Sequence, residues 1–182
     1  MFKPALPIET PRLVLRPFTL DDLTDLHSFY SLPEVARFLY WEPRDLEQVR
    51  TTLTEKAAVT ELTDEGQVLC LAVTLRETGE LIGEVLLFWR SREHRQGEVG
   101  YVFHPGHHGR GYATEATKEM LRLGFEGLGL HRIVARCDGR NTASTKVMER
   151  LGMRREAHLV ENEMVKGEWT DEIVYAVLRR DF

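Results

Sequence analysis

Ten residues, H-H-G-R-G-Y-A-T-E-A at positions 107–116, form a glycine-rich segment between an apolar run that ends at Phe103 and a pattern with helical spacing. Glycine has no Cβ, so the backbone N–H groups of such a loop can crowd around a ligand. The first N–H groups of a helix lack acceptors and carry partial positive charge. The segment is therefore typical of a loop that binds a phosphate group at a helix start.

The apolar periodicity on either side of this loop predicts helices and strands in one mixed sheet. Before it we expect a strand at 12–17, helices at 19–31, 33–39 and 44–62, and strands at 68–75, 81–89 and 98–103. After it we expect a helix from 112, a strand at 132–137, a helix at 141–151, and strands at 154–165 and 170–178. This order predicts an α/β (α+β) fold in a single domain over 1–182, with a core at about residues 8–180.

The composition excludes some classes of protein. The net charge is −5 with no basic stripe, which argues against a nucleic-acid binder. No apolar stretch approaches the ~20 residues of a membrane span, and residues 1–7 lack the apolar core of a signal peptide. We therefore expect a cytoplasmic protein without a membrane partner. Cys70 and Cys137 are far apart in strand-like runs, so we expect buried free thiols.

Three phosphate-binding devices compete for the loop. A P-loop would need Lys-Ser or Lys-Thr after its glycines, and none follows Gly111. A dinucleotide fingerprint would need a third Gly or Ala where Thr114 stands, and it would follow the first strand of a parallel unit rather than a predicted antiparallel meander. The remaining interpretation is that the loop binds the pyrophosphate of an acyl-CoA.

The chain resembles the GNAT superfamily of acyl-CoA-dependent N-acyltransferases, and most of all its RimJ/RimL-like branch. The "T-x-R-L-x-L-R" strand of that branch appears at 10–16, and the pyrophosphate motif [Q/R]-x-x-G-x-[G/A] maps onto 108–113, followed by T-E-A at 114–116. The N-x-x-S segment appears at 141–144. One departure is His108, which stands where the family usually has Gln or Arg.

The resemblance implies the GNAT fold, a single mixed and mostly antiparallel sheet flanked by helices, with two strands that splay apart to hold acetyl-CoA. It implies coenzyme A as the product. It assigns backbone or side-chain contacts with the cofactor to Val102, Phe103, His104, His108, Gly109, Arg110, Gly111, Tyr112, Ala113, Thr114, Asn141 and Ser144. Asn141 has a second reading as the N-cap of the following helix.

Three residues are candidates for catalysis by the same resemblance. Met148 stands where many GNAT enzymes have a tyrosine that protonates the leaving thiolate, which points to Ser144 as the group that stabilises it. Glu98 is the first candidate for the residue that orients or deprotonates the amine, and Glu84 on the neighbouring predicted strand is the second. No cysteine stands in a nucleophile context, which favours direct transfer.

The resemblance leaves open which amine accepts the acetyl group. A lysine side chain costs about 4–5 kcal/mol to deprotonate at pH 7, against about 1–1.4 kcal/mol for an α-amino group, so an α-amino acceptor needs only a mild base. We expect a protein or peptide N-terminus, with a small-molecule amine (amino acid, polyamine or antibiotic) or a CoA-binding module without useful catalysis as alternatives. A homodimer, common in the superfamily, is left open.

Aromatic and histidine side chains complete the set of candidates. The acceptor pocket could be walled by aromatic residues, and the candidates are Tyr30, Tyr40, Trp41, Trp89 and Trp169. His104, His107 and His108 have a spacing that could suit zinc, but no carboxylate or cysteine accompanies them, so no metal site is expected.

Overall fold

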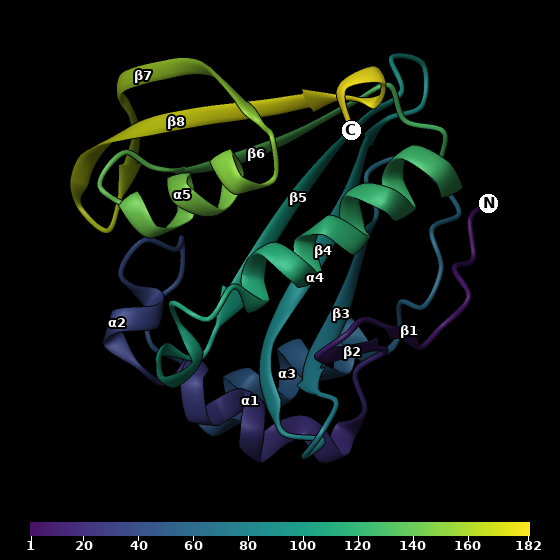
Figure 1. Ribbon diagram of the computed structural model, residues 1–182. Coiled ribbons are helices and arrows are strands. Elements are labelled where there is room, and N and C mark those ends of the chain that lie inside the picture. The colour runs from purple at the N-terminus through teal and green to yellow at the C-terminus, as the bar shows by residue number, and fades with distance from the viewer.

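The apolar runs of the sequence form one eight-stranded sheet in the computed structural model, which describes residues 1–182 (Figure 1). Its strand order is β1-β2-β3-β4-β5-β6-β8-β7. Every neighbouring pair is antiparallel except β5–β6, which is parallel. The strands are β1 Ile8–Glu9, β2 Leu13–Arg16, β3 Val68–Leu75, β4 Leu81–Ser91, β5 Gln96–Phe103, β6 Arg132–Asp138, β7 Arg154–Val165 and β8 Glu168–Leu178.

Five α-helices lie between these strands, together with short 3₁₀ turns at Leu20–Asp22 and Pro105–His107, and a third 3₁₀ turn, Arg179–Asp181, follows β8. A π-helical turn, Leu123–Gly127, continues α4. No helix is both long enough and apolar enough to cross a membrane. The helices are α1 Leu23–Tyr30, α2 Pro33–Ala36, α3 Leu46–Ala57, α4 Tyr112–Arg122 and α5 Thr142–Arg150.

The predicted order of elements is confirmed, with differences near the N-terminal half. The helix expected at 44–62 ends at Ala57, because Leu62 is instead buried in a β-bridge with Phe2. The helix expected at 33–39 is a single turn that ends at Ala36. Strand β1 was not predicted, since two residues are too short to show a period.

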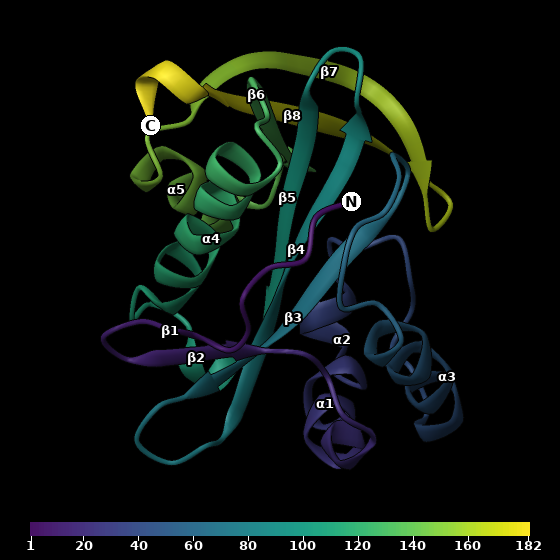
Figure 2. The ribbon, with the colours of Figure 1, turned by 90° about the vertical axis from the view of Figure 1, so that its right-hand side faces the viewer.

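The helices form a layer on each face of the sheet, which is clearest in Figure 2. Helices α4 and α5 cover one face, and the core between them and the sheet contains 27 buried residues, Met120, Phe125 and Ile133 among them. Helices α1, α2 and α3 lie on the other face, where nine buried residues, including Phe29 and Leu53, form a smaller core.

The sheet opens between β5 and β6. These two strands pair at three positions only, Gln96↔Arg132, Gly97↔Ile133 and Glu98↔Val134. Beyond Glu98 the strands separate, while β5 remains paired with β4 as far as Phe103 and β6 with β8 as far as Asp138. The splayed pair expected from the resemblance is thus confirmed, and we call the space between the separated ends the cleft.

Candidate active site

The glycine-rich loop lies at the mouth of the cleft and leads into α4, as predicted. Gly109 and Gly111 have φ angles of +76° and +81°, a region that residues with a Cβ rarely adopt. Gly111 is the N-cap of α4 and has no side chain to cap it, and the first bond of the helix runs from the Glu115 N–H to the Gly111 carbonyl. The N–H groups of residues 112–114 therefore point out of the helix start, where an anion can accept them.

A brace from the N-terminal strand region holds this loop. The Arg12 Nε donates to the Glu115 carboxylate at 2.7 Å, and the Arg12 backbone N–H donates to the same group at 3.0 Å. Arg12 Nη1 donates to the Arg110 carbonyl at 2.9 Å, and the Thr10 hydroxyl donates to Glu115 at 2.7 Å. Residues 10–12 thus fix both the loop backbone and the first turn of α4, a link that sequence reasoning missed.

The donor set of the loop fits a diphosphate group. The Thr114 Oγ1 is buried without a hydrogen-bond partner, which is costly unless a ligand supplies one. Arg110 has an exposed side chain beside the unbonded N–H groups. These residues would hold the pyrophosphate of a coenzyme A molecule, whose extended arm would then reach into the cleft.

The register of β4 against β5 determines which backbone groups of β5 face the cleft, where the extended arm of coenzyme A would lie. The His104 N–H donates to the Ile82 carbonyl at 2.9 Å. Because bonding direction alternates along an antiparallel strand, Val102 also directs its backbone groups to β4, whereas Tyr101 and Phe103 direct theirs to the cleft. The Val102 and His104 backbone groups therefore face β4, so the expectation that they face the cofactor is wrong, and the groups directed to the cleft are those of Tyr101 and Phe103.

The histidines around the loop each have a separate partner. His108 Nε2 lies 2.9 Å from the Phe103 carbonyl, so one ring nitrogen contacts the end of β5. Its side-chain contact with the pyrophosphate stays a prediction. His104 Nδ1 accepts the Gly106 N–H, and His107 Nε2 contacts Glu80 at 3.1 Å. No three His, Cys, Asp or Glu side chains are grouped as metal ligands.

Helix α5 places a hydroxyl group on the far side of the cleft. The Asn141 side chain accepts the Ser144 N–H at 3.1 Å, so Asn141 is the N-cap of α5, the second of its two readings. Ser144 is buried, and its Oγ lies 2.8 Å from the Tyr101 phenol oxygen. Tyr101 was not among the candidates, although the alternation of β5 places it on the same face as Val99 and Phe103.

Cys137 stands beside this hydroxyl pair. Burial raises the pKa of the Cys137 thiol to about 11, against a smaller lowering effect from a hydrogen bond with Ser144. The thiol is free, as expected, and it stays protonated at neutral pH. A protonated thiol is a poor nucleophile, which agrees with direct transfer.

A cavity of about 230 Å³ opens on the face of the sheet that carries α1 and α2. Cys137 is in its lining, so this cavity, which we call the acidic pocket, meets the cleft at the point where β5 and β6 separate. Two arginines line it, Arg90 and Arg136. Five carboxylates outnumber them, and these are Glu98, Asp138, Glu163, Asp171 and Glu172.

Glu98 contributes one free oxygen to the acidic pocket. The Arg90 Nε and Nη2 both donate to Glu98 Oε2, at 2.9 and 2.5 Å, and the Arg136 Nε is 3.5 Å from the same atom. Oε1 has no protein partner. The carboxylate is thus fixed by two cations and presents one oxygen that can accept a proton or orient an amine.

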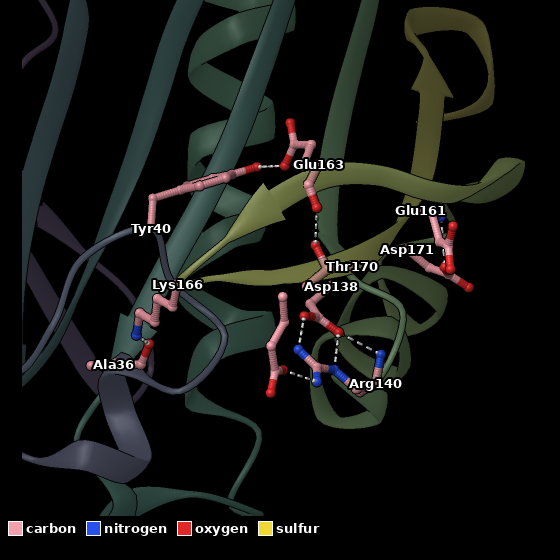
Figure 3. Close-up of polar contacts among 10 residues, drawn as sticks. Ala36, Tyr40, Asp138, Arg140, Glu161, Glu163, Lys166, Thr170 and Asp171 are labelled. Carbon is pink, nitrogen blue, oxygen red and sulfur yellow. Dashed lines mark hydrogen bonds and ion pairs between the residues drawn. The ribbon is translucent and has the colours of Figure 1, made fainter.

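Glu163 differs from the other carboxylates of the pocket because it has no Arg, Lys or His partner. The only donor to its carboxylate is the Tyr40 phenol, at 2.5 Å, from the loop after α2 (Figure 3). Burial and the nearby Glu163 carboxylate raise the pKa of Tyr40 above its usual range. Lys166, at the turn of the β7–β8 hairpin, donates to the Ala36 carbonyl at 2.7 Å and pairs with Glu42 at 3.7 Å, so the hairpin contacts both the end of α2 and the loop after it.

Glu84 lies elsewhere, in a buried cluster beneath α1 and α3. Its side chain is 3% exposed and bonds to Lys56 Nζ at 2.7 Å and to the Tyr30 phenol at 2.7 Å. Burial alone would lower the pKa of Lys56, but the Glu84 charge outweighs it and holds that pKa well above its usual range. Glu84 does not line the acidic pocket, and both its oxygens are bonded, so we no longer assign it a catalytic role.

Only one of the five aromatic candidates lines the acidic pocket, and it is Tyr40. Tyr30 is buried in the Glu84 cluster, and Trp89 is buried in the larger core. Trp41 lines a separate hollow next to α3, and Trp169 is exposed on β8. Pattern alone could not separate these cases, because each environment depends on residues distant in sequence.

The sequence matches the family model described as "Acetyltransferase (GNAT) domain" over residues 12–154. It is 32% identical to the uncharacterized N-acetyltransferase p20 of Bacillus licheniformis, over 95% of this chain and 96% of that protein.

Solved structures show the same fold. The GNAT-family acetyltransferase from Bacillus anthracis is 31% identical and superposes with a TM-score of 0.86, covering 96% of this chain and 99% of that one. The spermidine N-acetyltransferase from Vibrio cholerae, solved in complex with CoA and spermine, is 22% identical with a TM-score of 0.78, covering 94% and 98%. The second likeness is one of fold alone.

Proposed function

The chain belongs to the GNAT family of N-acetyltransferases, and we propose that it transfers the acetyl group of acetyl-CoA directly to an amine held in the acidic pocket. The observation that carries this proposal is the position of Cys137, which lines the acidic pocket and neighbours Ser144 across the cleft. A donor in the cleft and an acceptor in the acidic pocket would meet there. The motifs at 10–16 and 141–144 favour the RimJ/RimL-like branch.

The donor would be held by backbone groups more than by side chains. The N–H groups of Gly109, Arg110, Gly111, Tyr112 and Ala113 would bind its pyrophosphate together with the Thr114 hydroxyl. The cleft-facing backbone groups of Tyr101 and Phe103 would pair with its pantetheine amides as an added strand does. Acetyl-CoA supplies an activated acetyl group and a thiolate leaving group.

The transfer itself needs a neutral amine and a stabilised leaving sulfur. Glu98 Oε1 would orient the amine and take its proton, directly or through water. A carbon–nitrogen bond forms, the carbon–sulfur bond breaks, and its electron pair stays on sulfur. Ser144 would donate a hydrogen bond to that sulfur, and the proton lost by the amine restores the thiol.

We propose an α-amino group of a protein or peptide as the first acceptor class. An α-amino group, with its ordinary pKa of about 7.7–8.0, is partly neutral at physiological pH, so a carboxylate already paired with two arginines is a sufficient base. Glu163 would receive any remaining positive charge of the acceptor in exchange for the Tyr40 phenol. Phe38, Leu39 and Tyr40 of the loop after α2 line the pocket, and a peptide acceptor would extend along them.

A polyamine is the second acceptor class, favoured by the charge of the acidic pocket. Most of the pocket carboxylates already have a basic partner, but Glu163 has none and Glu98 Oε1 has no protein partner, so two positions can each receive an ammonium group. The structural neighbour from Vibrio cholerae bound to spermine acts on such amines, which makes spermidine and spermine the natural probes.

A panel of acceptors tests the proposal. CoA release from acetyl-CoA is measured with peptides that begin with Ser or Ala, with N-acetylated copies of those peptides, and with spermidine, spermine and free amino acids. Turnover of free but not N-acetylated peptides supports the first class, and higher kcat/KM for polyamines supports the second. Binding of CoA without release for any amine would leave only a CoA-binding module.

The role of Glu163 has a matched control in the same hairpin. Glu163→Gln removes the unpaired charge, and we expect kcat/KM to fall about tenfold for an acceptor with a second positive charge, while kcat at saturation stays within about twofold. Glu161→Gln changes an exposed carboxylate outside the pocket and should change neither. Equal losses in the two variants would remove Glu163 from acceptor binding.

A further inference from the structure

Two hydroxyl groups meet across the cleft. Tyr101 lies on β5 beyond Glu98, the last position where β5 pairs with β6, and its side chain reaches α5. The phenol oxygen is 2.8 Å from Ser144 Oγ and 3.0 Å from the Ser144 carbonyl. Because Asn141 caps the first turn of α5, the position of the Ser144 hydroxyl is fixed from both sides.

The Tyr101 and Ser144 hydroxyl groups each have one proton to donate, so two hydrogen-bond patterns are possible. In the first, Tyr101 donates to the Ser144 carbonyl and Ser144 donates to the phenol oxygen. In the second, Tyr101 donates to Ser144 Oγ, and the Ser144 proton is free for a third atom. Both distances permit either state, so a negative charge that appears in the cleft would select the second.

We propose that Tyr101 is a positioning residue that directs the Ser144 proton to the CoA sulfur as the carbon–sulfur bond breaks. This inference rests on the proposed function, which places the donor thioester in the cleft. Tyr101 then strengthens the Ser144 hydrogen bond, because a hydroxyl that accepts one hydrogen bond donates a stronger one. Met148, one turn further along α5, stands where many GNAT enzymes have a tyrosine and has no hydroxyl group. The Tyr101 phenol thus gives the site a second hydroxyl group beside that of Ser144.

Tyr101 keeps its proton throughout this step. Burial raises the pKa of the phenol above its usual range, with a smaller opposing effect from the bond with Ser144. A buried tyrosinate would be costly, so the pair stabilises the sulfur by hydrogen bonding and gives up no net proton. The proton that restores the thiol is the one lost by the attacking amine.

A second tyrosine that bonds to α5 separates this role from simple attachment of the helix. Tyr175 on β8 donates to Glu149 at 3.0 Å near the C-terminal end of α5. Tyr101→Phe and Tyr175→Phe therefore each remove one phenol that tethers α5, but only the first borders the cleft. A purely structural role predicts similar consequences for the two variants.

The first test is a comparison of kcat and KM. Tyr101→Phe should lower kcat about tenfold to a hundredfold, with KM for acetyl-CoA within about twofold. This loss is smaller than the roughly hundredfold to thousandfold cost of removing a direct donor to a developing charge, because Tyr101 acts through Ser144. Tyr175→Phe should leave both constants near wild type. Ser144→Ala should cost as much as the double variant with Tyr101→Phe, because Tyr101 acts through Ser144. Additive losses would overturn the proposal.

The second test measures binding without turnover. CoA and desulfo-CoA, which lacks the sulfur atom, are titrated calorimetrically against wild type at pH 7 and at pH 9.5, on either side of an ordinary thiol pKa of about 8.5. A charge-assisted hydrogen bond predicts that wild type prefers CoA by about tenfold or more at pH 9.5 and less at pH 7. Tyr101→Phe should lose most of this preference, and Tyr175→Phe should keep it.

The outcomes distinguish this inference from the proposed function. Failure of wild type to bind either compound would contradict the donor site itself. Tight but equal binding of the two compounds by wild type at both pH values would keep the donor site and overturn the role of Tyr101. The wild-type titration decides this even if Tyr101→Phe does not fold.

Discussion

The Arg12 guanidinium and the Glu115 carboxylate, 103 positions apart in the sequence, form a salt bridge with the Nε and Oε2 atoms 2.7 Å apart. The Arg12 backbone N–H bonds the same carboxylate, and the Arg12 Nη1 bonds the Arg110 carbonyl within the glycine-rich loop. Burial raises the pKa of Glu115, but the bonds from Thr10 and Arg12 outweigh it and hold this pKa below its usual range. The strand motif at 10–16 thereby shapes the proposed pyrophosphate site.

Loss of this charge should weaken CoA binding more than catalysis. Glu115→Gln keeps the shape of the side chain but removes the ion pair, and we expect the Kd of CoA to rise about five- to twentyfold while kcat stays within about twofold. Glu119→Gln, which breaks the half-buried pair with Arg122 on the same helix, is the control and should leave the Kd unchanged. Calorimetric titration with CoA measures the Kd of both variants. An unchanged Kd in Glu115→Gln would show that the Arg12–Glu115 pair does not support CoA binding.

The buried Lys56–Glu84 pair should dominate the effect of charge removal on stability. Glu84→Gln leaves the Lys56 ammonium buried without its counter-charge, so we expect a loss of about 3–5 kcal/mol in the free energy of unfolding. Lys56→Met combined with Glu84→Leu should recover most of that loss. Asp64→Asn, which breaks an exposed pair with Arg92, should cost under about 1 kcal/mol. Urea unfolding that ranks the single variants in the opposite order would contradict the buried pair.

The free energy of unfolding should fall in acid as the Asp22 carboxylate becomes protonated. Burial raises the pKa of this carboxyl, but the bonds from Arg16 and Thr19 outweigh it, so the folded pKa is lower than the unfolded one. The unfolded chain then binds the proton first, and the stabilisation that is complete above about pH 4 is lost as pH falls through the folded pKa. The difference in unfolding free energy between wild type and Asp22→Asn should shrink from pH 7 to pH 3. The exposed neighbour change Asp21→Asn should show no such trend.

The Cys137 thiol should react slowly and carry no acetyl group. With burial holding its pKa at about 11, the thiolate fraction at pH 7 is about a hundredfold or more below that of an ordinary cysteine. Iodoacetamide should therefore modify it much faster in the urea-unfolded chain than in the folded protein. Intact-mass measurement during turnover should find no acetylated protein. A stoichiometric acetyl adduct at Cys137 would contradict direct transfer.

Sequence periodicity predicted the meander, the loop and α4 because each depends on neighbouring residues. The apolar runs at 81–89 and 98–103 and the glycines at 109 and 111 are local signals, and they coincide with β4, β5 and the start of α4. The resemblance added the splay of β5 from β6, which no local pattern contains. The assignments of cofactor contacts remain predictions, now placed around the same cleft.

The partners of each candidate side chain could not be predicted in the same way. Glu84 and Glu98 look alike in sequence, yet one meets Lys56 from α3 and the other meets Arg90 and the acidic pocket. Whether the backbone groups of Val102 or of Tyr101 face the cleft depends on the register of β4 against β5. A shift of one residue would exchange the residues that bond to β4 with those that face the cleft. Long-range pairing therefore determined which candidates stayed in the site.

Acceptor-dependent release of CoA tests the central claim most directly. Wild-type protein is mixed with acetyl-CoA, the free thiol is counted, and the acetylated amine is measured by mass spectrometry in the same sample. The account predicts thiol release that requires an amine, with one acetylated amine for each CoA released and a rate that falls in Ser144→Ala. Release no faster than in buffer for every peptide and polyamine, or release at the same rate without an acceptor, would contradict it.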